Sequence, residues 1–236
     1  MKSKPRVAVL YAPGTNCHKE TLHAVTELLT YPAKIILLKE NGKLSHSLKN
    51  FTHLIIPGGF SFGDHFGAGR VAALLIKYGC MDELKEFIQR GGKVMGICNG
   101  YQILCELGFL PGTLALNTSE RFESRWIRVR TTLDEFWAKS DLENKILRLP
   151  VAHAEGRFVI RPGDTIYPAM HYLNKEDLWA VGNDYPENPA GSERAIAGIF
   201  SDFRGQIFGL MPHPERACLP IHESQDGLAV LKAFLV

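Results

Sequence analysis

A cysteine that stands between two glycines is the first candidate for chemistry in this sequence, in the segment Gly96-Ile97-Cys98-Asn99-Gly100. Residues 93–97 have the pattern of a buried strand, and a helical pattern follows the cysteine. A strand that turns sharply into a helix can hold its corner side chain above the sheet only if the flanking positions lack bulk. The spacing therefore predicts a nucleophile elbow with Cys98 at its corner.

The helix expected after Cys98 would supply further groups that a thiol nucleophile needs. Its first turn carries unpaired N–H groups and a partial positive charge, which favour the thiolate form. The Asn99 N–H lies next to the nucleophile, where it can donate to an oxyanion, and Gln102 lies one helical turn on, facing the same pocket. The alternative is that Cys98 is a small buried hydrophobic residue and that the glycines only permit close packing.

A nucleophilic cysteine also needs a base, and the sequence offers two pairs of histidine and glutamate. They are His213-Pro214-Glu215 and His153-Ala154-Glu155, and residues two apart in an extended segment point to the same side. Prolines before and after His213 hold the first pair in an extended conformation. These arguments favour His213 and leave His153 open.

The loop Pro57-Gly58-Gly59-Phe60 follows another predicted strand, and its glycines let the backbone approach a ligand closely. We expect the Gly59 N–H to be a second oxyanion donor, although an ordinary turn explains the same residues. The loop lacks the lysine and the spacing of a phosphate-binding loop, and the chain carries no recognisable metal-binding motif. The sequence therefore predicts neither a cofactor nor a metal in this chain.

The elements that must position these residues alternate between strands and helices in the first half of the chain. Strands are expected at residues 6–12, 34–39, 53–57 and 93–97, and helices at 17–29 and 71–90. This order predicts an α/β, flavodoxin-like fold: an open, doubly wound, mostly parallel sheet flanked by helices, whose ligands bind beyond the carboxyl ends of the strands.

The second half of the chain is expected to add antiparallel strands. Their predicted positions are residues 126–131, 146–151, 157–160, 195–200 and 206–211. Residues 183–192 predict a loop, and a closing helix, capped by Ser224 or Asp226, is expected to run through Leu235.

Composition and charge narrow the class of protein. The 236 residues are 45% hydrophobic, and the formal net charge of +2 comes from dispersed side chains, which argues against a nucleic-acid-binding surface. The five cysteines include no Cys-x-x-Cys pair, and the apolar run at residues 7–12 is too short for a signal peptide. We expect one domain over residues 1–236, reduced thiols, and a cytoplasmic protein that does not bind a membrane.

Several segments carry a resemblance to a known family. Residues 96–102 have the form G-x-C-x-G-x-Q, and His-Pro-Glu follows at 213–215. Further matches lie at residues 13–17, 57–64, 121–126, 150–157 and 209–217. Together they resemble the class I (triad) glutamine amidotransferase family, and within it the PurQ-type glutaminase subunits of phosphoribosylformylglycinamidine synthase. The chain departs from the pattern at Gly67, where arginine is usual, and carries Arg70 three residues later.

The resemblance implies a catalytic triad of Cys98 as nucleophile, His213 as base and Glu215 as the carboxylate that orients His213. It thereby selects His213 over His153. In the implied reaction, the Cys98 thiolate attacks the side-chain amide of L-glutamine, His213 protonates the departing ammonia, and water hydrolyses the thioester to glutamate.

The resemblance also implies the remaining site residues and the partners. Gly59 and Asn99 would form the oxyanion hole, and Gln102, Arg121 and Phe122 would bind glutamine. Since the chain has no ATP-binding motif, the ammonia must be used elsewhere. The implied partners are a large PurL-type synthetase subunit, on which ATP and Mg²⁺ are expected, and a small bridging PurS-type subunit. The complex would make formylglycinamidine ribonucleotide in purine biosynthesis.

Three other functions remain open on sequence alone. The chain could be a glutaminase subunit that serves another synthetase. It could be a stand-alone, elbow-type cysteine hydrolase that acts on esters or peptides. It could also be a flavodoxin-like binding module without catalysis, which would tolerate the loss of Cys98.

Overall fold

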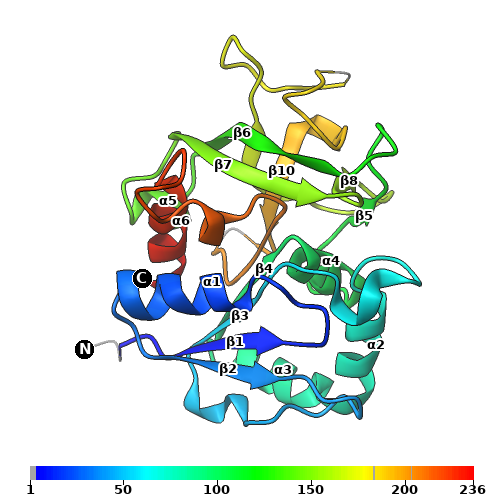
Figure 1. Ribbon diagram of the computed structural model, residues 1–236, viewed down its shortest axis with the longest axis vertical. Helices are drawn as coiled ribbons and strands as arrows, with labels where there is room; N and C mark the ends of the chain where they lie inside the picture. The colour runs from blue at the N-terminus through cyan, green and yellow to red at the C-terminus, as the bar shows by residue number, and fades with distance from the viewer. Residues whose placement is uncertain (1–3, 183, 203) are drawn as a thin grey trace.

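The central sheet joins a parallel half to an antiparallel half (Figure 1). The computed structural model describes residues 4–182, 184–202 and 204–236. In these residues, nine strands form one sheet in the order β2-β1-β3-β4-β11-β10-β9-β6-β7. The parallel strands, in sheet order, are β2 (Ala33–Leu37), β1 (Val7–Tyr11), β3 (His53–Ile56), β4 (Lys93–Ile97) and β11 (Ile207–Leu210).

The antiparallel half extends the same sheet from β11. Its strands are β10 (Ile196–Phe200), β9 (Tyr167–Tyr172), β6 (Glu123–Thr131) and β7 (Ile146–His153). A separate antiparallel pair is formed by β5 (Thr113–Ala115) and β8 (Arg157–Val159). The predicted fold class, a mostly parallel sheet with added antiparallel strands, is confirmed.

The helices lie on two faces of the parallel half because the sheet is built outward in two directions. The connection from β1 to β2 and the connection from β3 to β4 run opposite ways across the sheet, so right-handed crossovers place their helices on opposite faces. The helices are α1 (His18–His23), α2 (Arg70–Gly79), α3 (Met81–Gln89), α4 (Asn99–Glu106), α5 (Glu135–Ala138) and α6 (Asp226–Leu235). In Figure 1, α6 lies beside residues 24–28, which directly follow α1, and α4 lies beside α2.

Short helical turns complete the described chain. Five residues after α1 form a π-helical turn, η1 (Ala24–Leu28). The 3₁₀ turns are η2 (Leu48–Asn50), η3 (Ser61–Asp64), η4 (Glu193–Ala195) and η5 (Pro214–Arg216). None of the helices in the described residues is long and apolar enough to cross a membrane.

Hydrophobic side chains fill both faces of the sheet. All four residues of β3 and of β11 are buried. Where the parallel and antiparallel halves meet, Phe136 and Trp137 of α5 pack against Phe200 of β10 and Phe208 of β11, with ring centroids 4.7–6.0 Å apart. This aromatic cluster holds β11, the strand that leads to His213.

Three helix predictions need correction. The single helix expected at 71–90 is two helices, because Gly79 packs on the backbone of Gly42 and Cys80 leaves helical geometry at φ −149°. The helix expected at 17–29 changes to π geometry at Ala24. The N-cap of α6 is Gln225, and the Ser224 hydroxyl instead accepts from the Asp226 N–H at 3.0 Å.

Two strands were not predicted from the sequence. One is β5, which is only three residues long, and the other is β9, whose Pro168 argues against a central strand. The structure accommodates this proline at an irregularity in the pairing of β9 with β10, where the register shifts. In the predicted loop, residues 184–192 contain neither helix nor strand, and Asn183 lies outside the described residues.

Candidate active site

Four chain segments meet beyond the carboxyl ends of the parallel strands. They follow β1, β3, β4 and β11, which are neighbours in the sheet. Ile97 at the end of β4 pairs with Leu210 at the end of β11, so Cys98 and the His213 segment leave the sheet side by side. The strand order thus brings together residues that are more than a hundred positions apart in sequence.

The sharp turn expected at Cys98 is present. Cys98 has φ 51° and ψ −103°, a positive φ that a residue with a side chain rarely adopts, and α4 begins at the next residue. A Cβ on Gly96 would lie 2.5 Å from the Gly100 carbonyl oxygen, and a Cβ on Gly100 would lie 1.9 Å from the Ile56 carbonyl oxygen. The two glycines are therefore required for close approach of the backbone around the strained cysteine.

His213 and Glu215 form a buried pair after β11. His213 Nδ1 lies 2.6 Å from Glu215 Oε1, and both side chains are almost completely excluded from solvent. The His213 backbone is fixed by its N–H, which donates to the Pro150 carbonyl of β7 at 2.8 Å. The second ring nitrogen, Nε2, is buried and has no hydrogen-bond partner among the described residues. The imidazole thus has one nitrogen held by a carboxylate and the other available for proton transfer.

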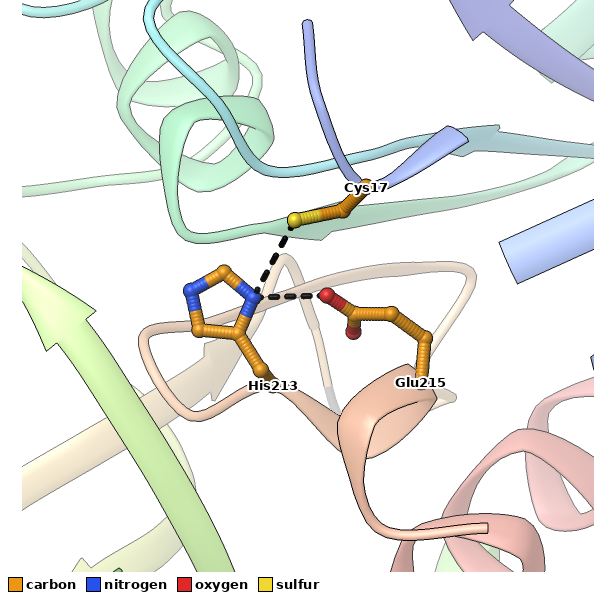
Figure 2. A group of neighbouring side chains, drawn as sticks. All are labelled: Cys17, His213 and Glu215. Carbon is orange, nitrogen blue, oxygen red and sulfur yellow. Dashed lines mark hydrogen bonds and ion pairs between the residues drawn. The ribbon is translucent and has the colours of Figure 1, made fainter. Parts of the chain in front are cut away.

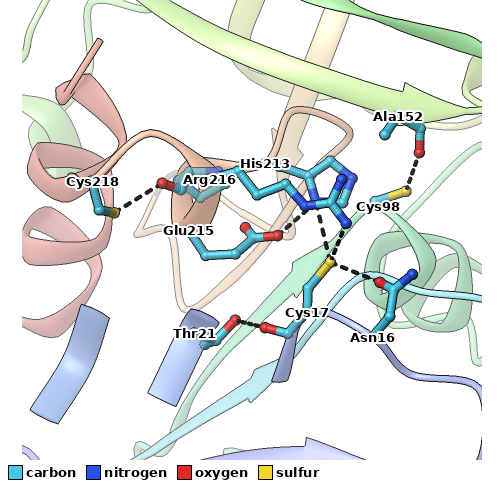
Figure 3. A network of polar contacts seen from close by, with 10 residues as sticks. Asn16, Cys17, Thr21, Cys98, Ala152, His213, Glu215, Arg216 and Cys218 are labelled. Atoms are coloured by element: carbon cyan, nitrogen blue, oxygen red, sulfur yellow. Dashed lines mark hydrogen bonds and ion pairs between the residues drawn. The ribbon is translucent and has the colours of Figure 1, made fainter. Parts of the chain in front are cut away.

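Cys98 lies beside this imidazole (Figure 3). Its Sγ is 3.6 Å from the Ala152 carbonyl oxygen of β7, and its side chain is buried. Burial by itself lowers the pKa of His213, but the charges of Glu215 and Cys98, together with hydrogen bonds to the two cysteines, raise it well above its ordinary value. Burial raises the pKa of Glu215, but His213, a backbone hydrogen bond and the charge of Arg216 together bring it below its ordinary value, so the carboxyl remains ionised. These directions favour a protonated imidazole paired with the Glu215 carboxylate.

The competing pair, His153 and Glu155, is not assembled. His153 Nδ1 lies 3.1 Å from Asn117 Oδ1, and Glu155 Oε2 accepts from the Ala68 N–H at 3.2 Å. Burial, with a smaller contribution from nearby His213, lowers the pKa of His153 to about 3. His153 therefore remains neutral near pH 7 and has no carboxylate to orient it.

A second cysteine joins the His213 and Glu215 pair (Figure 2). Cys17 Sγ lies 3.8 Å from His213 Nδ1, and the three potential ligand atoms of Cys17, His213 and Glu215 are within 4.8 Å of one another. Thiol, imidazole and carboxylate are ligands that zinc accepts. A metal ion here would have to displace the proton shared by His213 and Glu215, and it would lie beside the Arg216 guanidinium, 2.9 Å from the same sulfur. That neighbouring positive charge opposes a metal ion.

The two expected oxyanion donors follow neighbouring strands, Gly59 after β3 and Asn99 after β4. Asn99 is the first residue of α4, so its N–H has no acceptor within the helix. Gly59 has φ 147° and is held by a bridge to Thr15, in the loop after β1. A Cβ on Gly59 would lie 2.7 Å from the Asn16 nitrogen, which requires glycine at this position.

A cavity of about 160 Å³ opens next to His213. It is lined by Asn16, Gly59, Phe60, Phe122, Ser124, Ala152, His213 and Arg216. This volume is below the ~300–1,000 Å³ typical of sites for drug-sized ligands, so it suits a molecule no larger than an amino acid. A larger cavity of about 590 Å³ lies on β6 and β7, where its charged side chains Arg125, Arg128 and Arg148 already have acidic partners.

The three residues expected to bind glutamine are placed differently from one another. Phe122 lines the cavity, with its ring centroid 6.3 Å from that of Phe60. Arg121 lines a separate cavity of about 400 Å³ and is not brought to His213. Gln102 is buried, and both ends of its amide are bound within the protein: Nε2 donates to the Glu155 carbonyl at 2.6 Å, and Oε1 accepts from Asn99 Nδ2 at 3.0 Å.

Two residues of the site were missed in the sequence. They are Cys17 and Arg216, and both fall in segments that carried the family resemblance, residues 13–17 and 209–217. Because Arg216 directly follows Glu215, its place near the site could have been predicted from the sequence. Its contact with Cys17, 199 residues earlier, could not, because no local pattern indicates it.

Comparison with known proteins agrees with this geometry. Residues 4–227 match the family model of the CobB/CobQ-like glutamine amidotransferase domain. The phosphoribosylformylglycinamidine synthase subunit PurQ of Rubrobacter xylanophilus is 38% identical over 231 residues, which cover 98% of this chain and 97% of that protein. The PurQ subunit of Pyrococcus furiosus is 36% identical over 236 residues, with the same coverage.

Solved structures give the same relationship. A chain in the structure of PurLQS from Thermotoga maritima has a TM-score of 0.81 and 32% identity, and the match covers 99% of this chain and 98% of that one. A glutamine amidotransferase from Thermotoga maritima, with a TM-score of 0.62, 15% identity and coverage of 99% and 96%, shares the fold. The chain therefore belongs to the CobB/CobQ-like glutamine amidotransferase family, and within it to the PurQ subunits of phosphoribosylformylglycinamidine synthase.

Proposed function

We propose that this chain is the glutaminase subunit of phosphoribosylformylglycinamidine synthase, and that it hydrolyses L-glutamine to glutamate and ammonia through a thioester on Cys98. One observation carries the proposal. Cys98 lies at a strained elbow beside an imidazole whose Nδ1 is 2.6 Å from a buried carboxylate, while its Nε2 has no partner among the described residues. This is the arrangement that activates a thiol and then returns a proton to a leaving group.

The reaction begins when the Cys98 thiolate attacks the side-chain amide carbon of glutamine. The carbon–sulfur bond forms, and the carbonyl electron pair moves to oxygen. As the oxyanion collapses, the carbon–nitrogen bond breaks and protonated His213 supplies the proton that releases ammonia. Water, deprotonated by His213, then attacks the thioester, and glutamate leaves as the sulfur returns to thiolate. Glu215 keeps the imidazole in the required orientation throughout.

The oxyanion forms twice in this cycle and needs donors in place each time. The N–H groups of Gly59 and Asn99 are the proposed donors, because Asn99 is the first residue of α4 and the Gly59 N–H donates no backbone hydrogen bond among the described residues. One such donor is worth roughly 2.7–4 kcal/mol in comparable hydrolases, so a loop in which the Gly59 peptide is rotated would leave the site nearly inactive. We assign glutamine contacts to Phe122 and, after release of its internal bonds, to Gln102.

The ammonia is consumed by a partner. The matched Thermotoga maritima structure is that of PurLQS, and this likeness supports a large PurL-type synthetase and a small PurS-type subunit as the partners of this chain. ATP and Mg²⁺ belong to the synthetase reaction, which makes formylglycinamidine ribonucleotide. We place the complex in the cytoplasm, where purine nucleotides are made.

The test mixes the chain with its synthetase and PurS-type partners and compares two nitrogen sources, glutamine and an ammonium salt. Cys98→Ala should lower the glutamine-driven reaction by at least ~10³-fold, the scale of loss when a catalytic nucleophile is removed. The ammonium-driven reaction should continue at the wild-type rate, because the synthetase does not need the thioester.

The matched control is Cys105→Ala, which removes a buried thiol from the same helix, α4. It should leave both reactions intact. Equal losses of both reactions in Cys98→Ala, or no loss of either, would exclude the proposed function. Hydrolysis of simple esters by the chain alone would instead support an independent cysteine hydrolase.

A further inference from the structure

The small cavity beside His213 contains one permanently charged side chain, Arg216. None of its lining residues is acidic. No carboxylate among the described residues lies within ion-pair distance of the Arg216 guanidinium, whereas Arg125, Arg128 and Arg148, which line the cavity on β6 and β7, each have such a partner. The charge of Glu215 acts on the half-buried Arg216, but that carboxylate is bound to His213 and does not line the cavity. The cavity is thus built to receive a negative group.

The guanidinium is held in this position by the second cysteine of the site. Arg216 Nη2 donates to Cys17 Sγ at 2.9 Å, and the Cys17 S–H donates to Asn16 Oδ1 at 3.0 Å (Figure 3). Cys17 is completely buried at the N-terminus of α1, and burial raises the pKa of its thiol. A neutral thiol can donate to one neighbour and accept from another, so Cys17 links two residues of the cavity wall.

The rest of the cavity suits the body of an amino acid that enters side chain first. His213 and Ala152 lie at the end nearest Cys98, since the Ala152 carbonyl oxygen is 3.6 Å from Cys98 Sγ. Phe60 and Phe122, each about half exposed, offer apolar surface for methylene groups. A substrate whose amide reaches Cys98 would therefore place its other end within the wall that holds Arg216.

We propose that Arg216 binds the α-carboxylate of the substrate glutamine, and that Cys17 is a positioning residue that aims the guanidinium into the cavity. The inference rests on the proposed glutaminase function and names the subsite that selects a free amino acid. A guanidinium and a carboxylate form strong, charge-assisted hydrogen bonds with a defined geometry. Glutamine whose α-carboxyl group is part of a peptide bond, or an amide without an α-carboxylate, is thereby excluded.

The test compares L-glutamine with L-glutaminamide, in which a neutral amide replaces the α-carboxylate. Ligand binding is measured by equilibrium dialysis on the reconstituted complex in a Cys98→Ala background, so that no turnover occurs. Adding Arg216→Met should raise the Kd for L-glutamine roughly 10- to 100-fold, the loss expected for one charge-assisted pair, and leave the Kd for L-glutaminamide unchanged. Arg216→Lys should retain part of the preference.

Two further variants sharpen the result. Cys17→Ala should weaken L-glutamine binding selectively, and Cys17→Ser, which keeps a donor and an acceptor, should restore most of it. Lys19→Met is the matched control, because it removes an exposed cation of α1 that borders a different cavity. It should change neither Kd.

The proposal is overturned if Arg216→Met leaves both Kd values unchanged or weakens both ligands equally. It is also overturned if Arg121→Met, rather than Arg216→Met, abolishes the preference for the carboxylate. Failure of the glutaminase function itself has a different signature, in which the complex with intact Cys98 binds L-glutamine and releases no ammonia.

Discussion

Gly58 occupies the space between the two side chains that we propose for catalysis. A Cβ at this position would lie 2.6 Å from His213 Cε1 and 3.4 Å from Cys98 Cβ. Carbon atoms in contact are normally ~3.5–4.0 Å apart, so the imidazole would have to move. The φ of Gly58 is accessible to other residues, and what selects glycine here is clearance for His213.

We therefore expect Gly58→Ala to lower glutamine-driven activity about 100-fold, the scale of loss when a catalytic group shifts by about 1 Å. The ammonium-driven activity of the same complex is the internal control and should not change. Steady-state assays with the two nitrogen sources measure both. Wild-type glutaminase activity in this variant would show that His213 has room to spare and that its position is not critical.

Spacing along the chain explains why part of the site could be predicted from sequence. The elbow at Cys98 and the His213 and Glu215 pair each lie within a few consecutive residues, so their chemistry can be inferred from local geometry. Which of two histidines carries the pair depends on the fold, because His153 turns to Asn117 in the folded chain. The contact of Arg216 with Cys17 joins residues 199 positions apart and leaves no local pattern.

At the scale of elements, the C-terminal helix supports the turn that carries the proposed triad. Gly227 of α6 packs directly on η5, where a Cβ would lie 1.9 Å from the Pro214 carbonyl oxygen. The helix and the turn are in extensive contact. Because Pro214 lies between His213 and Glu215, a displacement of α6 is transmitted to both partners of the pair.

Replacing Gly227 with alanine tests this contact. In an unconstrained helix interior, the change would stabilise the protein by roughly 1 kcal/mol. Here we expect a loss of about 1–3 kcal/mol in the free energy of unfolding, because backbone must move to admit the methyl group. Chemical denaturation measures the change, with Ala229→Gly on the same helix as the reference for propensity alone. An increase in stability would mean that α6 is free to shift.

Helices and strands that are determined by the local hydrophobic pattern were predicted correctly. Those that depend on contacts between distant segments were missed. Apolar runs mark β3 and β4 clearly, and their bounds agree with the prediction within about one residue. The break between α2 and α3 arises because Gly79 meets Gly42, a contact between segments far apart in the chain. Strand β9 was not predicted because it contains Pro168, and a proline in a central strand is tolerated only where the hydrogen-bonded pairing of the strands is irregular.

For the whole molecule, buried neutral histidines set the response to acid. Burial lowers the pKa of His53 to about 4, helped by the charge of Lys93, and lowers the pKa of His153 to about 3. Burial also lowers the pKa of His171. Between these values and the ordinary 6.5, the unfolded chain binds protons that the folded chain does not, so stability falls as the pH falls. His213 affects stability in the opposite direction, because its pKa is raised in the folded chain. Its stabilising contribution is fully present below pH 6.5 and is lost as the pH rises through the raised pKa.

We expect the free energy of unfolding to drop by a few kcal/mol, in order of magnitude, between pH 6.5 and about pH 4. His53→Gln should flatten this dependence, because it removes one group that must stay neutral. Urea denaturation at a series of pH values measures both. His23→Gln, at an exposed position on α1, is the reference and should retain the wild-type slope. A stability that does not change over this range would contradict the assignment.

The edge strand β7 has a consequence for the spacing of nucleophile and base. Its Pro150 carbonyl accepts from the His213 N–H, and its Ala152 carbonyl accepts from Cys98 Sγ. These two oxygens are one pleat repeat apart, ~6.4–6.8 Å along the strand. The backbone of β7 therefore sets the distance between Cys98 and His213, and this distance is fixed by the length of the peptide unit. Substitutions of side chains along β7 leave the spacing unchanged, whereas a single inserted residue would shift one of the two carbonyl groups away from its partner.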